Sequence, residues 1–186
     1  MNTLYEKNPR EMLHSKRVSE MCVLIAKSMN CDDDFINQIR IAGLMHDIGK
    51  IGIEENILNK EGELNDYEWC EIKKHCEIGY RILSSVNEYL EIAEFVLEHE
   101  ERWDGAGYPK GLKGDQISLQ ARIISLADSY DAMTGSRTYK ERASKEEAIE
   151  ELLRCSGTQF DSEIVKVFIE KVVGGLENLS DEILIG

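Results

Sequence analysis

Apolar residues recur at spacings of three and four along most of this chain, and this period constrains its fold more than any other feature. Such spacing places apolar side chains on one face of an α-helix, which has about 3.6 residues per turn. Only two prolines, Pro9 and Pro109, occur in the 186 residues, and alternating β-branched residues are scarce. The sequence therefore predicts an all-α protein.

Seven segments carry apolar stripes of this kind: residues 13–29, 35–48, 72–83, 92–103, 117–134, 145–155 and 162–173. We expect Gly49 to end the second helix. Residues 104–114, with four glycines and Pro109, form the one clear loop. A chain of this length can bury one core but would crowd two domains. We expect a single domain over 1–186, with a core at about 10–140 and C-terminal helices at about 144–186.

Composition limits the kinds of partner. The formal net charge of −14 argues against binding to DNA, RNA or an anionic membrane, so an anionic ligand needs locally concentrated positive charge. The five cysteines include no CxxC pair, which favours reduced thiols. Neither a signal peptide nor an apolar run of roughly 18 residues is present, so we expect a cytoplasmic protein.

The four histidines suggest a shared chemical site. A single histidine on an apolar face is usually hydrogen-bonded to a carbonyl group within the core. Here, however, all four lie on apolar stripes of different helices, as do two aspartates: His14, His46, His75, His99, Asp47 and Asp128. A cation stabilises buried imidazoles and carboxylates together. We therefore expect a metal centre.

His46 and Asp47 indicate how many ions this centre holds. Adjacent helical residues point about 100° apart, so the pair cannot easily chelate one ion. They can serve a two-metal site in which Asp47 bridges the ions. We expect them in the last helical turn, where the helix dipole also favours cations.

Motifs in a fixed order then point to a family. In sequence they are HSKRV, LMHDIGKIGI, EIKKHCEIG, HEERWDGAGYPKGLKG, ARIISLADSYDAMTGSRTYKERAS and GTQFD. The chain resembles HD-GYP domains, the cyclic di-GMP phosphodiesterase branch of the HD metallohydrolase superfamily. That resemblance implies a compact helical bundle of five core helices plus additional helices, with a glycine-rich GYP loop.

The resemblance also implies residue roles. Six side chains correspond to metal ligands: His14, His46, Asp47, His75, His99 and Asp128. Asp47 and Lys50 would be catalytic. Six residues correspond to the substrate-binding side: Lys50, Gly107, Tyr108, Pro109, Arg137 and Lys140. The loop could also be a simple connector, although tyrosine can stack on a base and glycine lets the backbone approach a ligand.

The chain departs from the family pattern at four positions. Glu100 stands where members usually have a second histidine, and we expect it to replace that ligand; the alternative is that it turns to solvent. Members with three metals carry a glutamate at the position of Arg10, and Glu11 is a shifted substitute, so we favour two ions. Cys76 and Glu61 stand where proline is common, and we expect both changes to leave the chemistry unaltered.

The expected activity is hydrolysis of cyclic di-GMP to pGpG or GMP by a hydroxide shared between two divalent ions. Imidazole and carboxylate ligands without a thiolate favour iron or manganese. The absence of Walker and Rossmann motifs argues against an organic cofactor. Two alternatives remain: a phosphohydrolase for another cyclic nucleotide such as cyclic GMP-AMP, and a weakened sensor that binds a cyclic dinucleotide. A homodimer or a protein partner is also left open.

Overall fold

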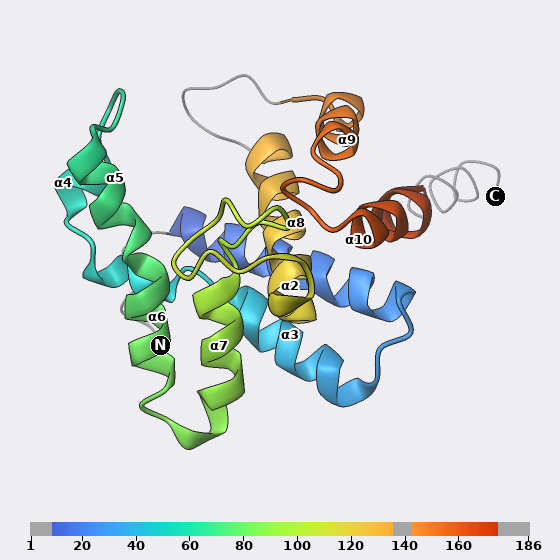
Figure 1. Ribbon diagram of the computed structural model, residues 1–186, viewed down its shortest axis with the longest axis horizontal. Helices are drawn as coiled ribbons and strands as arrows, with labels where there is room; N and C mark the ends of the chain where they lie inside the picture. The colour runs from blue at the N-terminus through green and yellow to red at the C-terminus, as the bar shows by residue number, and fades with distance from the viewer. Residues whose placement is uncertain (1–8, 136–142, 175–186) are drawn as a thin grey trace.

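The computed structural model describes residues 9–135 and 143–174, which are helical and contain no β-strand (Figure 1). The α-helices are α2 (Pro9–Ser28), α3 (Asp33–Met45), α4 (Glu55–Leu58), α5 (Asp66–Lys73), α6 (His75–Leu83), α7 (Leu90–Glu98), α8 (Leu119–Thr134), α9 (Lys145–Arg154) and α10 (Ser162–Val167). The 3-10 helices are η1 (Ile48–Gly52), η2 (Asn87–Tyr89) and η3 (Gly114–Gln116), and a π-helix, η4, covers Phe168–Val173. The all-α prediction is confirmed.

Short polar residues explain where several helices begin. The Asp32 carboxylate accepts a hydrogen bond from the Phe35 N–H and starts α3. Asn65 and Ser144 start α5 and α9, each in a capping box with a glutamate three residues later. These caps satisfy N–H groups that have no partner within the helix.

Three helix boundaries differ from the sequence prediction. The second helix ends at Met45, so His46 and Asp47 follow its last residue instead of lying in its last turn. The third divides at Lys74 into α5 and α6, and the fourth ends at Glu98, before the loop. At each of these boundaries a histidine side chain points into the site described below. The spacing of apolar residues does not reveal where these boundaries fall.

Gly49 has a different role from the expected helix end. It lies within η1, where a Cβ atom would stand 1.8 Å from the His75 carbonyl oxygen and 2.6 Å from the Gly79 nitrogen. The residue is therefore required by the close approach of η1 to α6. This contact places the HD segment beside the start of α6.

Two groups of helices make up the fold around the site. In the first, α2 packs against α3 and α8; in the second, α6 packs against α7 and η1 (Figure 1). Val18, Ile39 and Ile123 are fully buried within the main hydrophobic core. Leu13 and Leu44, in contrast, are 53% and 37% exposed, so these two members of the apolar stripes do not face the core.

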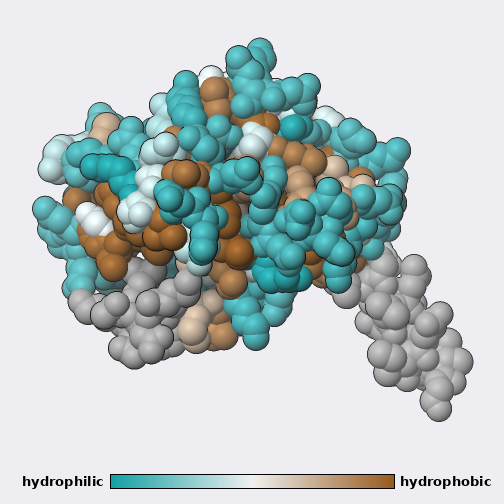
Figure 2. All heavy atoms as spheres, turned by 90° about the horizontal axis from the view of Figure 1, so that it is seen from below, coloured by the Kyte–Doolittle hydropathy of each residue, from teal (hydrophilic) through white to brown (hydrophobic). Residues whose placement is uncertain are grey.

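The surface agrees with the acidic composition. Figure 2 shows mainly hydrophilic residues on the face seen from below, with smaller hydrophobic areas between them. None of the helices within residues 9–135 and 143–174 has the length and apolarity needed to span a membrane.

Candidate metal centre

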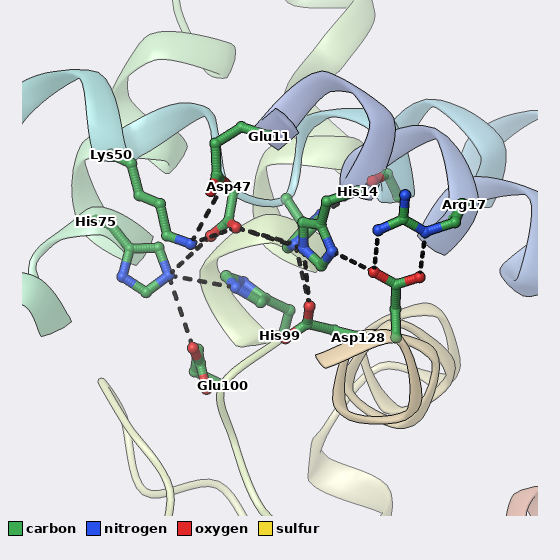
Figure 3. Close-up of polar contacts among 12 residues, drawn as sticks. Glu11, His14, Arg17, Asp47, Lys50, His75, His99, Glu100 and Asp128 are labelled. Carbon is green, nitrogen blue, oxygen red and sulfur yellow. Dashed lines mark hydrogen bonds and ion pairs between the residues drawn. The ribbon is translucent and has the colours of Figure 1, made fainter. Parts of the chain in front are cut away.

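The structure brings all six expected metal ligands together. Figure 3 labels His14, Asp47, His75, His99 and Asp128 among them. They come from the two helix groups, and several lie at helix ends: His14 on α2, His46 and Asp47 directly after α3, His75 at the start of α6, His99 directly after α7, and Asp128 on α8. His46, His75 and His99 are almost completely buried.

One half of the centre consists of His14, His46 and Asp128, whose donor atoms lie within 4.8 Å of one another. The Nε2 atom of His14 is 3.0 Å from Asp128 Oδ1, and that of His46 is 3.7 Å from the same oxygen. These three side chains could hold one ion with nitrogen and oxygen ligands.

The other half surrounds the Nε2 atom of His75. His99 Nε2 lies 3.3 Å from it, Cys76 Sγ 3.5 Å, and Glu100 Oε1 3.9 Å. His75, Cys76 and His99 form a second group whose donor atoms lie within 4.8 Å of one another. The sulfur in this group was not anticipated, because Cys76 was expected to have no part in the site.

Asp47 lies between the two halves. Its Oδ2 atom is 3.3 Å from His46 Nε2 and 3.9 Å from His14 Nε2, whereas its Oδ1 atom is 3.7 Å from His75 Nε2. The two oxygens of one carboxylate therefore face different halves. This is the arrangement expected for a bridging ligand.

Backbone carbonyl groups fix the orientation of three histidine rings. The Nδ1 atoms donate to the carbonyl three residues earlier: His46 to Gly43 at 2.9 Å, His75 to Ile72 at 2.8 Å, and His99 to Val96 at 2.6 Å. A carbonyl can only accept, so each Nδ1 carries a proton, and in the neutral ring Nε2 presents a lone pair. The Nε2 atom of His46 is buried without a hydrogen-bond partner, an environment that a bound cation would satisfy.

Nearby carboxylates offset the effect of burial on the pKa of His46 but not on that of His99. Burial, together with the neighbouring His75 and His46, lowers the pKa of His99 to about 3. Burial also opposes a charge on His46, but Asp47 and Asp128 raise its pKa well above the usual value. The electrostatic potential is therefore more negative in the His14–His46–Asp128 half of the centre than around His99.

Lys50 neutralises part of this negative charge. Its Nζ atom is 2.5 Å from Asp47 Oδ2 and 3.9 Å from Glu11 Oε2. Burial opposes the charge on Lys50, but Asp47 and Glu11 raise its pKa above the usual value, so the ammonium remains charged. A positive charge therefore already lies at the Asp47 oxygen that faces His14 and His46.

Arg17 and Asp131 complete the environment of His14, and sequence reasoning missed both. Asp131 Oδ2 accepts a hydrogen bond from His14 Nδ1 at 2.8 Å, which turns Nε2 toward Asp128. Arg17 donates twice to the same carboxylate, at 2.6 Å and 2.8 Å. Asp131 follows Asp128 by three residues, on the same face of α8, and this spacing was the available signal.

We expect Asp131→Asn to weaken divalent metal binding by about 10–100-fold, because loss of such an outer carboxylate releases the ligand histidine. Metal titration followed by calorimetry measures this change. Asp115→Asn is the control, since its 90% exposed side chain belongs to a surface pair with Arg122. Unchanged affinity in Asp131→Asn would contradict the positioning role.

The glycine-rich loop is attached to the end of α7 through a buried carboxylate. Glu101 accepts hydrogen bonds from the backbone N–H groups of Lys110, Gly111 and Leu112 at 2.6, 3.0 and 3.0 Å. A Cβ atom at Gly107 would stand 2.4 Å from the Arg102 nitrogen, so the backbone can pass there only as glycine. These contacts give the loop a defined conformation, so it is more than a simple connector between α7 and α8.

We expect Glu101→Gln to lower the free energy of unfolding by about 1–3 kcal/mol, because an amide cannot accept at both ends and one partly buried N–H loses its partner. Chemical denaturation measures the loss, and hydrogen exchange should accelerate at residues 110–112. Glu150→Gln, at an exposed glutamate of α9, provides the comparison. Equal stability of the two variants would show that Glu101 does not hold the loop.

The expected substrate-binding residues are only partly placed. The Tyr108 ring lies 6.5 Å from the His75 ring and 5.1 Å from Lys73 Nζ, so the Gly107–Pro109 triplet lies beside the second half of the centre. The backbone N–H of Tyr108 donates to the Glu100 carbonyl at 3.2 Å. Arg137 and Lys140 lie outside the described residues.

Histidine and aspartate side chains that converge from α2, α3, α6, α7 and α8 define a helical, metal-binding domain of the HD class. A family model described as "HD domain" matches residues 1–164. The chain is 43% identical over 159 residues to a cyclic di-GMP phosphodiesterase of Thermotoga maritima, covering 84% of this chain and 43% of that protein. It belongs to the HD-GYP family, whose metallohydrolase ancestry implies binding of divalent metal.

Further comparisons agree with this assignment. A 3'3'-cGAMP-specific phosphodiesterase of Vibrio cholerae is 36% identical, with 84% of this chain and 30% of that protein covered. The chain thus spans less than half the length of these relatives. The crystal structure of a cyclic GMP-AMP-specific phosphodiesterase of V. cholerae has a TM-score of 0.70 at 22% identity, covering 90% of this chain and 45% of that one. The PgpH HD domain of Listeria monocytogenes has a TM-score of 0.67 at 15% identity over 96% and 97% of the two chains. Both structures share the fold.

Proposed function

We propose that this chain is a metal-dependent phosphodiesterase that opens a cyclic dinucleotide, with cyclic di-GMP as the preferred substrate and pGpG or GMP as the product. The observation that carries the proposal is Asp47, whose two oxygens face two separate groups of metal-binding side chains. Relatives named as cyclic di-GMP phosphodiesterases support the substrate class. The reacting residues lie within one proposed domain spanning 1–186.

The proposed roles follow from the contacts of each residue. Two bound divalent ions would lower the pKa of water and neutralise charge on the phosphate. Asp47 orients the two halves relative to each other, and the histidines keep their Nε2 lone pairs directed inward through their carbonyl contacts. Lys50, released from Asp47, would move its ammonium toward a phosphate oxygen. Two divalent ions and Lys50 carry more charge than the Asp47, Asp128 and Glu100 carboxylates, which favours an anionic ligand.

Iron or manganese is the proposed occupant of the His14–His46–Asp128 half, where imidazole and carboxylate are the available ligands. Two ions are favoured over three. Glu11 Oε2 lies 3.9 Å from Lys50 Nζ, so this shifted glutamate already has a partner of opposite charge. The Arg137 and Lys140 side chains are proposed to bind substrate phosphates.

The test combines metal analysis of anaerobically purified protein with turnover of cyclic di-GMP and 3'3'-cGAMP, each followed by chromatography of the linear product. We expect two divalent ions per chain, hydrolysis of cyclic di-GMP, and loss of activity after chelation. Faster turnover of 3'3'-cGAMP would instead favour the specificity named for the V. cholerae relatives. Binding of cyclic di-GMP without hydrolysis in the fully loaded protein would identify a sensor and overturn the proposed reaction.

Glu100 supplies a separate prediction. Its carboxylate lies 3.9 Å from His75 Nε2, and burial raises its pKa. As a ligand it replaces a neutral nitrogen with a charged oxygen and lowers the Lewis acidity of the ion. We expect Glu100→Ala to reduce occupancy of one ion and Glu100→His to raise turnover, by elemental analysis and steady-state kinetics. Unchanged occupancy, metal preference and rate in Glu100→Ala would exclude ligation.

A further inference from the structure

Cys76 lies at a position in the second half of the centre that the proposed reaction does not use. Its side chain is fully buried in the first turn of α6, directly after His75. The Sγ atom, His75 Nε2 and His99 Nε2 lie within 4.8 Å of one another. The cysteine is therefore one member of a three-residue donor group.

The two separations from His75 Nε2 match those of ligands on one tetrahedral ion. Metal–nitrogen bonds of about 2.0–2.1 Å and a metal–sulfur bond of about 2.3 Å place two nitrogens about 3.3 Å apart and a nitrogen and sulfur about 3.5 Å apart. The observed distances from His75 Nε2 are 3.3 Å to His99 Nε2 and 3.5 Å to Cys76 Sγ. His75 and Cys76 are the first two residues of α6, so the helical divergence that separates neighbouring side chains is offset here by the orientation of the His75 ring, which places its Nε2 atom 3.5 Å from the sulfur.

The lone pairs of the histidines provide a second, independent observation. The Nδ1 atoms of His75 and His99 donate to backbone carbonyls, so in the neutral rings neither Nε2 atom carries a proton. The two Nε2 atoms then lie 3.3 Å apart in a buried position with no proton to share between them. A cation bound by both nitrogens removes the repulsion between their lone pairs, and two carboxylate oxygens lie within reach: Asp47 Oδ1 at 3.7 Å and Glu100 Oε1 at 3.9 Å from His75 Nε2.

We propose that Cys76 is a thiolate ligand of the ion held by His75 and His99, and that it directs this half of the centre toward zinc. The inference rests on the proposed metal centre, not on turnover. As the sulfur–metal bond forms, the thiol proton passes to the solvent. Sulfur favours a borderline-soft ion, whereas the His14–His46–Asp128 half offers only nitrogen and oxygen. The two halves therefore select different metals.

Cobalt(II) is the probe, because thiolate ligation gives a sulfur-to-cobalt charge-transfer band in the near ultraviolet. We expect this band in the cobalt-loaded protein and its loss in Cys76→Ala and Cys76→Ser. Cys70→Ser, at an exposed cysteine, is the matched control and should retain the band. In mixtures of zinc with excess manganese, Cys76→Ala should lose more than about 100-fold in zinc affinity, since even an outer-shell change costs 10–100-fold.

The outcomes distinguish this inference from the proposed function. A protein that binds two ions and hydrolyses cyclic di-GMP, but shows no charge-transfer band, would overturn the role of Cys76 alone. Retention of the band in both Cys76 variants would do the same. A protein that shows the band without hydrolysis would support the thiolate while the proposed reaction fails. Thermal unfolding of the metal-free variants verifies that they fold, and the alanine and serine variants provide two independent replacements.

Discussion

Asp47→Ala is expected to lose most bound metal and to lower turnover by more than about a thousandfold, because one carboxylate faces both halves of the centre and its removal affects both ions. Lys50→Ala should behave differently. Its ammonium contacts Asp47 Oδ2 and competes with a bound ion for this oxygen, so we expect metal binding at least as tight as in the unmodified protein. Turnover should fall by about 10²–10³, as when one charge-stabilising group is removed.

Elemental analysis, metal titration and steady-state kinetics separate the two effects. Lys16→Ala is a suitable control, because this exposed lysine of α2 forms only a surface pair with Glu20 among the ion pairs of the described residues. Comparable metal loss in Asp47→Ala and Lys50→Ala would contradict the division between a bridging ligand and a phosphate-binding cation.

Gly49→Ala is expected to lower the free energy of unfolding by about 3 kcal/mol or more and to displace His75 from the centre. The added methyl group would stand 1.8 Å from the His75 carbonyl oxygen, and backbone cannot yield as a flexible side chain does. Denaturation and metal titration should therefore show a joint loss of stability and metal binding.

Gly52→Ala is the matched control within the same η1 segment. A Cβ atom there would first meet the end of the Ile78 side chain at 3.0 Å, which can move, so we expect a smaller loss of stability and normal metal binding. If the two alanine variants were equally stable, close packing of η1 on α6 would not be what requires glycine at Gly49.

Much of the fold was predictable because residues on the buried face of a helix are apolar and recur every three or four positions in the sequence. Val18, Cys22 and Ile25 recur at helical spacing and are fully buried in α2. The convergence of the histidines was predictable for a related reason: imidazoles on several apolar faces need a common partner. The ends of the helices were harder to predict from the sequence. Helix α3 stops at Met45 without a glycine, and contacts with α6 determine the turn that follows.

The polar contacts around the centre could not be derived from spacing. Arg17 and Asp131 are 114 residues apart, and one arginine in an exposed helical position gives no sign of a partner on another helix. Glu101 appeared to be an ordinary charged residue near a loop, although its carboxylate binds three backbone groups. Cys76 was expected to leave the chemistry unaltered because neighbouring helical side chains usually diverge, whereas the orientation of the His75 ring brings its Nε2 atom to 3.5 Å from the sulfur.

The division of the metal-binding side chains between two helix groups has a consequence for the lifetime of the protein. His75 and Cys76 belong to α6, whereas His14 and Asp128 belong to α2 and α8, so bound ions would link the two helix groups beyond the packing of α7 on α3 and α8, and would oppose local opening between them. Ions that bind only the closed form add their binding free energy to the cost of that opening. Proteolysis follows the open population, so metal-starved copies would be degraded first, and the supply of metal would set the abundance of the protein as well as its chemistry.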